Sequence, residues 1–143
     1  MNPIEEFGAA LGAGNVLTGA ETAGYATDWT GRYVGNPLAV LRPGSTAEVA
    51  LILRRADETG TPVVPVGGNT GLSGGTKADG ALMVSLERMN RIVEIRPEAR
   101  IAIVEAGVVL SALHDAVEAQ GLKFPVTFGA RGSAMIDGIL STN

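Results

Sequence analysis

Residues 65–75 are the most informative stretch of the sequence and read Pro65-Val66-Gly67-Gly68-Asn69-Thr70-Gly71-Leu72-Ser73-Gly74-Gly75. Five of the nine positions from 67 to 75 are glycine, so successive backbone N–H groups have no side chains to shield them. Several N–H groups that point the same way form a nest, which binds anions such as phosphate. Asn69, Thr70 and Ser73 add side-chain donors. The stretch therefore predicts a phosphate-binding loop between two strands.

Two common phosphate loops do not fit these residues. A nucleotide-triphosphate loop needs Gly-Lys-Ser/Thr, whereas Gly75 is followed by Thr76. A dinucleotide-binding fingerprint needs Gly-x-Gly-x-x-Gly at the start of a helix, and neither spacing nor context provides it. No Lys or Arg lies between Arg55 and Lys77, so backbone dipoles more than formal charge would hold an anion here. On composition alone, a flexible surface hairpin is equally favoured, since glycine loops are common.

Apolar spacing and capping residues outline the elements around this loop. Three helices are predicted: one with Ile4, Phe7 and Leu11 on one face, one from Ser45 to Gly60, and one with Leu110, Leu113 and Val117 that Gly121 ends. Strands are expected over residues 62–66, 81–86, 91–95 and 101–105, with a short one possible over 124–128. The prolines in the strand at 62–66 argue against a fully paired position at the centre of a sheet. Residues 12–42 and 129–143 read as irregular, and the whole predicts an α+β fold with two small layers.

Composition excludes several classes of protein. The net charge of −4 has the wrong sign for a nucleic-acid footprint, and no apolar run is long enough to span a bilayer. The first six residues do not resemble a secretory signal. There are no cysteines, which excludes disulfides, thiolate metal sites and cysteine nucleophiles within this chain. We expect a cytoplasmic protein that binds a small molecule.

Six segments, in order along the chain, carry a family resemblance: residues 25–33, 42–50, 65–72, 86–92, 104–108 and 132–138. The glycine loop closely resembles the pyrophosphate loop of FAD-binding domains of the vanillyl-alcohol oxidase and para-cresol methylhydroxylase (PCMH) type. Residues 25–33 look like the N-terminal motif of the D-lactate and D-2-hydroxyglutarate dehydrogenase (glycolate oxidase subunit-like) branch. The resemblance implies the first subdomain of a PCMH-type FAD-binding domain and the start of its second, incomplete at the C-terminus. Residues 1–36 would form an N-terminal helix and irregular segment, and residues 37–143 the FAD-binding domain.

What this resemblance implies is a flavin enzyme that oxidises a 2-hydroxy acid such as D-lactate, glycolate or D-2-hydroxyglutarate to the 2-oxo acid. Relatives with covalent flavin often carry a His where Asn69 stands or use a Cys, so the FAD is expected to be non-covalent. Two segments would hold the FAD, the first with Pro65, Val66, Gly67, Gly68, Asn69, Thr70, Gly71 and Leu72, the second with Gly132, Ser133, Ile136, Gly138 and Ser141. No catalytic or metal-binding residue is assigned, and the chain by itself is expected to be inactive.

The second segment departs from the family pattern. The family usually carries a Gly pair followed by Asn, whereas Asp137, Gly138 and Ile139 stand here. At ~4 Å, repulsion between a carboxylate and a diphosphate costs roughly 1–4 kcal/mol, depending on the local dielectric. The sequence therefore predicts either that Asp137 points away from the cofactor or that cofactor affinity is low.

Two other hypotheses stay open: a self-sufficient small domain that binds a flavin or nucleotide without catalysis, and a cofactor-free remnant. A chain cut within the flavin domain would leave an apolar face uncovered around Phe124, Val126, Ile136, Ile139 and Leu140. We therefore expect self-association through this face or disorder after about residue 125, because burying apolar surface is worth about 25 cal/mol per Å². His114, the only histidine, is expected to be a partly exposed structural residue, and Glu105 a hydrogen-bonded carboxylate.

Overall fold

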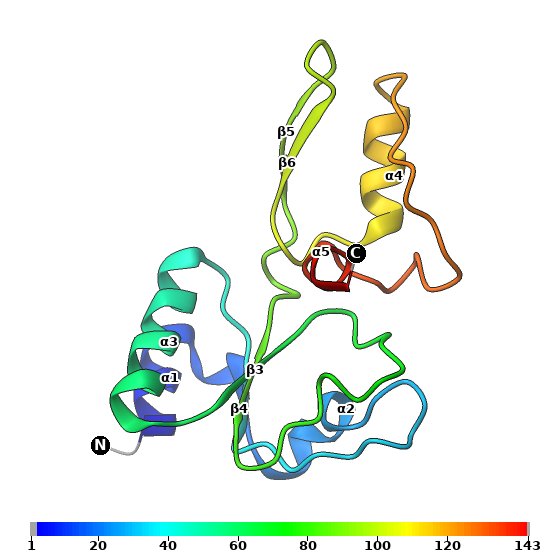
Figure 1. Cartoon of the computed structure of the whole chain (residues 1–143). Coiled ribbons are helices and arrows are strands. Elements are labelled where there is room, and N and C mark those ends of the chain that lie inside the picture. The colour runs from blue at the N-terminus through cyan, green and yellow to red at the C-terminus, as the bar shows by residue number, and fades with distance from the viewer. Residues whose placement is uncertain (1–2, 143) are drawn as a thin grey trace.

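The computed structural model describes residues 3–142 and arranges them in two regions (Figure 1). The first region holds a four-stranded sheet with two helices on one face, and the second holds a two-stranded hairpin with two helices. This confirms the predicted α+β class. The elements are α1 (Pro3–Leu11), β1 (Val16–Leu17), α2 (Ala23–Ala26), β2 (Ala39–Leu41), α3 (Thr46–Thr59), β3 (Val63–Val66), β4 (Leu82–Ser85), β5 (Ile92–Arg96), β6 (Ile101–Val104), α4 (Leu110–Glu118) and α5 (Ile136–Thr142), with single 3₁₀ turns at Ala13–Asn15 and Gly19–Thr22.

The sheet has the strand order β1-β2-β4-β3. Strands β2, β4 and β3 run parallel, with Val40 and Val64 both opposite Met83, and β1 is antiparallel to β2. Strand β3 lies at the edge, which confirms the position that its prolines predict. Because β3 and β4 are parallel neighbours, residues 67–81 form the crossover between them. The glycine loop therefore begins at the carboxyl end of β3.

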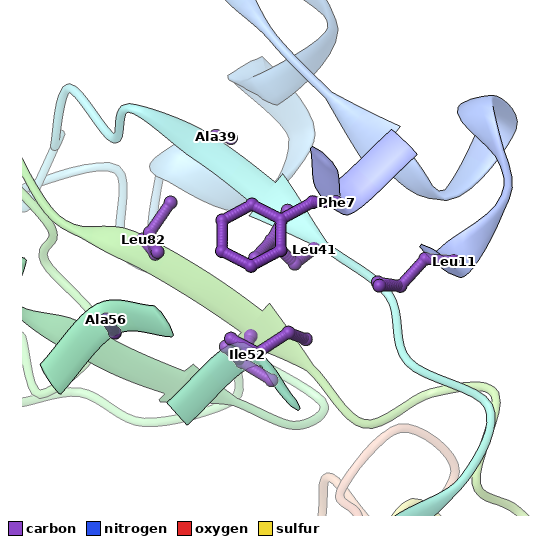
Figure 2. Packing of buried hydrophobic residues seen from close by; sticks show 8 residues of the cluster. Phe7, Leu11, Ala39, Leu41, Ile52, Ala56 and Leu82 are labelled. Carbon is purple, nitrogen blue, oxygen red and sulfur yellow. The ribbon is translucent and has the colours of Figure 1, made fainter. Parts of the chain in front are cut away.

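One face of the sheet is covered by α1 and α3, as Figure 2 shows for the buried cluster Phe7, Leu11, Ala39, Leu41, Ile52, Ala56, Leu82 and Val84. The predicted helix start and end are confirmed for α3. The Ser45 hydroxyl accepts a hydrogen bond from the Glu48 N–H at 3.2 Å, and Gly60 ends the helix with a left-handed φ of 62°.

The short helix α2 and irregular segments cover the other face of the sheet. Val40, Val66 and Met83 pack there against Ala78 and Ala81 of the crossover, and the part-buried Tyr25 closes the cluster. Strands buried on both faces are continuously apolar and do not alternate. This explains why all four residues of β4 are buried.

The second region has a small core of its own. Val108, Leu113, Val117 and Ile136 form its buried cluster, against which β5 and β6 pack through part-buried apolar side chains. A groove of about 950 Å³ lies between β6, α4 and α5. Its lining includes Ile101, Ile103, Phe124 and Leu140, so the groove is mainly apolar.

Three sequence predictions of secondary structure are wrong. Residues 12–42 contain the strands β1 and β2, and β2 is completely buried at the middle of the sheet. Residues 124–128 form no strand, and the stretch from Ile136 to Thr142, predicted as loop, is the helix α5. The sequence also predicts that Asn2 caps the first helix, and Asn2 lies outside the described residues. No helix within residues 3–142 is long and apolar enough to cross a bilayer.

Candidate functional site

The glycine loop leaves the sheet where Val66 of β3 lies opposite Ser85 of β4. Its first residues, 67–70, are half-buried, and residues 71–73 are exposed. Pro65 and Val66 belong to the strand rather than the loop, and Val66 is part of the core. Leu72 projects from the loop with 64% of its surface exposed.

The backbone N–H groups from Gly67 to Leu72 are the distinctive feature of this loop. Within residues 3–142, none of them donates a hydrogen bond to another group of the protein. Backbone N–H groups that are buried away from water are normally paired, because leaving such a donor without a partner costs free energy. Asn69 turns the chain here with a left-handed φ of 52°. Such a run of available donors, with no cation among residues 56–76, is suited to an anion held by backbone dipoles.

The Asn69 side chain is not one of the available donors, and this part of the sequence prediction is wrong. Its Nδ2 donates to the carbonyl O of Thr27 at 3.0 Å and of Tyr25 at 3.3 Å, and its Oδ1 accepts from the Thr76 hydroxyl at 2.6 Å. The side chain therefore fastens the loop to the segment at 25–27 and closes the loop on itself. Within the described part of the chain, the Thr70 and Ser73 hydroxyls form no hydrogen bond to the protein.

The segment around Asp28 packs against the same loop. The Asp28 carboxylate accepts from the Thr30 hydroxyl at 2.7 Å and from the N–H groups of Arg32 and Tyr33, and these bonds lower its pKa although burial acts in the opposite direction. The turn brings the Tyr33 ring so close to Gly74 that a Cβ atom there would lie 2.7 Å from Tyr33 Cδ1. Asp28 thus packs within the chain, whereas Trp29 is 77% exposed.

The two segments predicted to hold the cofactor meet at Gly67 and Gly68. A Cβ atom on Gly68 would overlap the carbonyl O of Ser133, and a Cβ atom on Gly67 would overlap the carboxylate of Asp137. Neither glycine has a positive φ. Glycine is needed at position 68 because the backbone of the second segment packs directly on it, whereas the neighbour of Gly67 is the end of a side chain.

The remaining residues of the second segment have different surroundings. Ile136 is 7% exposed and belongs to the core of the second region. Gly132, Ser133 and Ser141 are exposed, and the Gly138 N–H donates to Asp137 Oδ1 at 2.6 Å. That these residues contact the cofactor stays a prediction.

Sequence reasoning missed a polar network beneath the loop. Arg42 and Glu87 follow the carboxyl ends of β2 and β4, and Arg42 NH1 lies 3.1 Å from Glu87 Oε1. The Tyr25 hydroxyl donates to the same carboxylate at 2.9 Å. The pKa of Tyr25 is raised, mainly by burial and secondly by this hydrogen bond to Glu87. Because the Tyr25 carbonyl accepts from Asn69, this network connects the sheet to the loop. The available signal was Glu87 shortly after the predicted strand at 81–86, whereas Arg42 follows β2, which the sequence did not predict.

Other candidate residues are structural. His114 Nε2 lies 2.9 Å from the carbonyl O of Val126, and Glu105, whose side chain is 12% exposed, accepts hydrogen bonds from the backbone and guanidinium of Arg91. Both observations agree with the predicted roles. Residues 3–142 contain no group of three or more His, Cys, Asp or Glu residues that could hold a metal ion.

Comparison with known proteins supports a flavin-binding fold. The chain superposes on p-cresol methylhydroxylase with a TM-score of 0.72 and 23% identity, over 91% of this chain and 26% of that one, which shows the PCMH-type fold. D-2-hydroxyglutarate dehydrogenase of Xanthomonas citri pv. viticola is 46% identical over 87% of this chain and 26% of its own length. The relative in Arabidopsis thaliana called "D-2-hydroxyglutarate dehydrogenase, mitochondrial" is 36% identical over 98% of this chain and 25% of its own length. The chain thus spans about a quarter of the length of these curated relatives.

Fold and family model together identify a flavin-binding domain. The family described as FAD binding domain matches residues 37–143. The chain belongs to this family of FAD binding domains, and the predicted family and cofactor, FAD, are confirmed at that level.

Proposed function

We propose that this chain forms the cofactor-anchoring part of a flavin-dependent oxidoreductase that converts a 2-hydroxy acid to a 2-oxo acid. The observation that carries the anchoring role is the run of unpaired N–H groups from Gly67 to Leu72 within the described chain. The names of the relatives support a substrate of the D-2-hydroxyglutarate type. We propose the same substrate class, with D-lactate and glycolate as smaller members.

FAD, when bound, supplies the hydride-accepting ring, and the protein binds and orients it. The N–H groups of Gly67, Gly68, Asn69, Thr70 and Gly71 would donate to the diphosphate. Gly132, Ser133, Ile136, Gly138 and Ser141 would flank the cofactor from the opposite side. The Asn69 side chain would keep the donors in place through its bonds to residues 25–27.

We further propose that the FAD is held without a covalent bond. Asn69 stands at the loop position where relatives with covalent flavin often carry a His, and its amide is hydrogen-bonded on both sides. The ring of His114 is engaged with Val126. Acid denaturation followed by filtration tests this proposal, because non-covalent flavin passes the membrane and covalent flavin stays with the protein.

Titration of the full chain with FAD and with riboflavin, followed by flavin fluorescence, tests the anchoring role. Riboflavin carries the same ring system and no phosphate. If the diphosphate is the anchor, FAD binds and riboflavin binds at least about tenfold more weakly, a difference of about 1.4 kcal/mol. Equal affinities would show that the ring and not the diphosphate is recognised. No FAD binding would contradict the proposed function.

Turnover is expected to require more than this chain. The described residues contain no hydroxyl or thiol nucleophile paired with a histidine base, because the chain has no cysteine and its one histidine ring bonds to a backbone carbonyl. Dye reduction with D-lactate or D-2-hydroxyglutarate in the presence of excess FAD should therefore show no activity of the chain alone. Activity that Gly68→Asp abolishes would place an active site in this chain.

Self-association through the exposed face near the C-terminal end is also part of the proposal. Of the residues predicted for this face, Leu140 is 75% exposed, Val126 is 38% exposed, and Phe124 and Ile139 are half-buried, whereas Ile136 is buried and does not belong to the face. We also propose that the chain divides into residues 1–36 and residues 37–143.

We propose a cytoplasmic location for this protein. The mitochondrion is the alternative, because the name of the Arabidopsis relative includes the word mitochondrial, and cell fractionation distinguishes the two locations.

A further inference from the structure

The carboxylate of Asp137 lies at the entrance of the glycine loop. A Cβ atom on Gly67 would overlap this carboxylate, so the two groups are in contact across the two cofactor segments. Gly67 is also the first of the six residues whose N–H groups donate to nothing in residues 3–142. An ionised carboxylate in contact with Gly67 would repel a phosphate that approached these donors.

Among residues 3–142, no Lys or Arg forms an ion pair with this carboxylate. Its Oδ1 accepts a hydrogen bond from the backbone N–H of Gly138 at 2.6 Å. The loop itself carries no titratable side chain from 67 to 76. Arg100 and Lys123 line the same groove as Asp137 without pairing with it.

The other charged groups around Asp137 are either bonded to other residues or exposed. The Asp137 N–H donates to the Ala106 carbonyl at 2.8 Å, and the neighbouring Glu105 carboxylate is bound to Arg91. On α4, His114 bonds to Val126 and Asp115 is exposed. Arg131, at the start of the second segment, is exposed and forms no ion pair within the described chain. Asp137 is the acidic group that contacts the loop backbone at Gly67.

We propose that Asp137 opposes phosphate binding at the glycine loop while its carboxyl group is ionised and permits it once protonated, so that FAD binding takes up a proton. This inference rests on the proposed function, because it concerns the same loop. Burial already raises the pKa of Asp137, and a bound diphosphate would raise it further by like-charge repulsion. FAD affinity should therefore rise as the pH falls through the pKa of Asp137. The diphosphate of FAD is esterified at both ends and keeps its charge over this range.

The test is FAD binding to the full chain and to Asp137→Asn, measured between about pH 8 and about pH 5, above the ordinary pKa of Asp. Asn keeps the shape and an acceptor for the Gly138 N–H, and removes the charge. At the upper pH the variant should bind FAD about five- to tenfold more tightly than the natural chain, and this advantage should shrink toward the lower pH. Asp115→Asn, an exposed charge removal on α4, is the matched control and should change nothing.

A second measurement does not depend on the variant. Calorimetric titration of the natural chain in two buffers of different ionisation enthalpy gives the number of protons taken up with FAD. Net uptake supports the proposal. The inference about Asp137 would be overturned if the natural chain and Asp137→Asn bound FAD with the same affinity and the same pH dependence. It would also be overturned if no proton were taken up with FAD. Neither result would contradict the proposed function. Absence of FAD binding in both proteins at every pH would overturn the proposed function and the inference with it.

Discussion

Gly68 has no room for a side chain, because a Cβ atom would overlap the carbonyl O of Ser133. We expect Gly68→Ala to force the two cofactor segments apart, with a cost of about 1–3 kcal/mol in the free energy of unfolding and weaker FAD binding. Gly75→Ala is the matched control, since a Cβ atom there meets nothing within 4 Å and its φ is not positive. Urea unfolding and FAD titration of both variants check this prediction. Equal losses in both variants would show that loop flexibility, and not the contact with Ser133, is what requires glycine.

At the same scale, sequence reasoning located the loop correctly and misread one side chain. The glycines and the flanking strands are sufficient to predict a loop between β3 and β4, and anion binding by this loop stays a prediction. The role of Asn69 could not be predicted, because its partners are backbone carbonyls 42 and 44 residues earlier in the chain. Asp137 is recognisable in the sequence as a departure from the family pattern. Its contact with Gly67 depends on the fold, which brings together two segments about 70 residues apart.

Among the elements, α4 and the hairpin β5–β6 form a core separate from the main sheet. Leu113 is 4% exposed in this core and shares no cluster with the residues around β2 and β4. Leu113→Ala should cost about 2–5 kcal/mol and open the second region first. Hydrogen exchange read by peptide mass should show lost protection over residues 92–118 and retained protection over 39–41 and 82–85. Uniform loss across both regions would mean that the chain unfolds as one unit.

Element boundaries were predicted well where local chemistry decides them. Helix α3 begins after the Ser45 cap and ends at Gly60 because both are local signals. Strand β2 was missed because it has three residues between Pro37 and Pro43, and pairing on both sides stabilises it rather than its own sequence. Helix α5 was missed because Gly138 and small polar residues disfavour helix, and the burial of Ile136 compensates.

The whole molecule carries an apolar face that the described part of the chain does not cover. Leu140 is its most exposed member at 75%. If the face mediates self-association, the natural chain should show concentration-dependent sedimentation, and Leu140→Glu should weaken association roughly tenfold, since burial of a Leu side chain is worth about 1.5–3 kcal/mol. Leu53→Glu, at a 49% exposed position on α3, is the control. A natural chain that stays monomeric at all concentrations would contradict the proposed self-association.

The central claim is that the backbone N–H groups from Gly67 to Leu72 bind the diphosphate of FAD. The most direct test is an amide NMR spectrum of the full isotope-labelled chain, recorded with FAD and with riboflavin as the phosphate-free reference. We predict that FAD produces the largest changes in amide chemical shift at residues 67–72. Riboflavin should leave the chemical shifts of these amides unchanged. FAD binding with the amides at 67–72 unchanged would contradict the account.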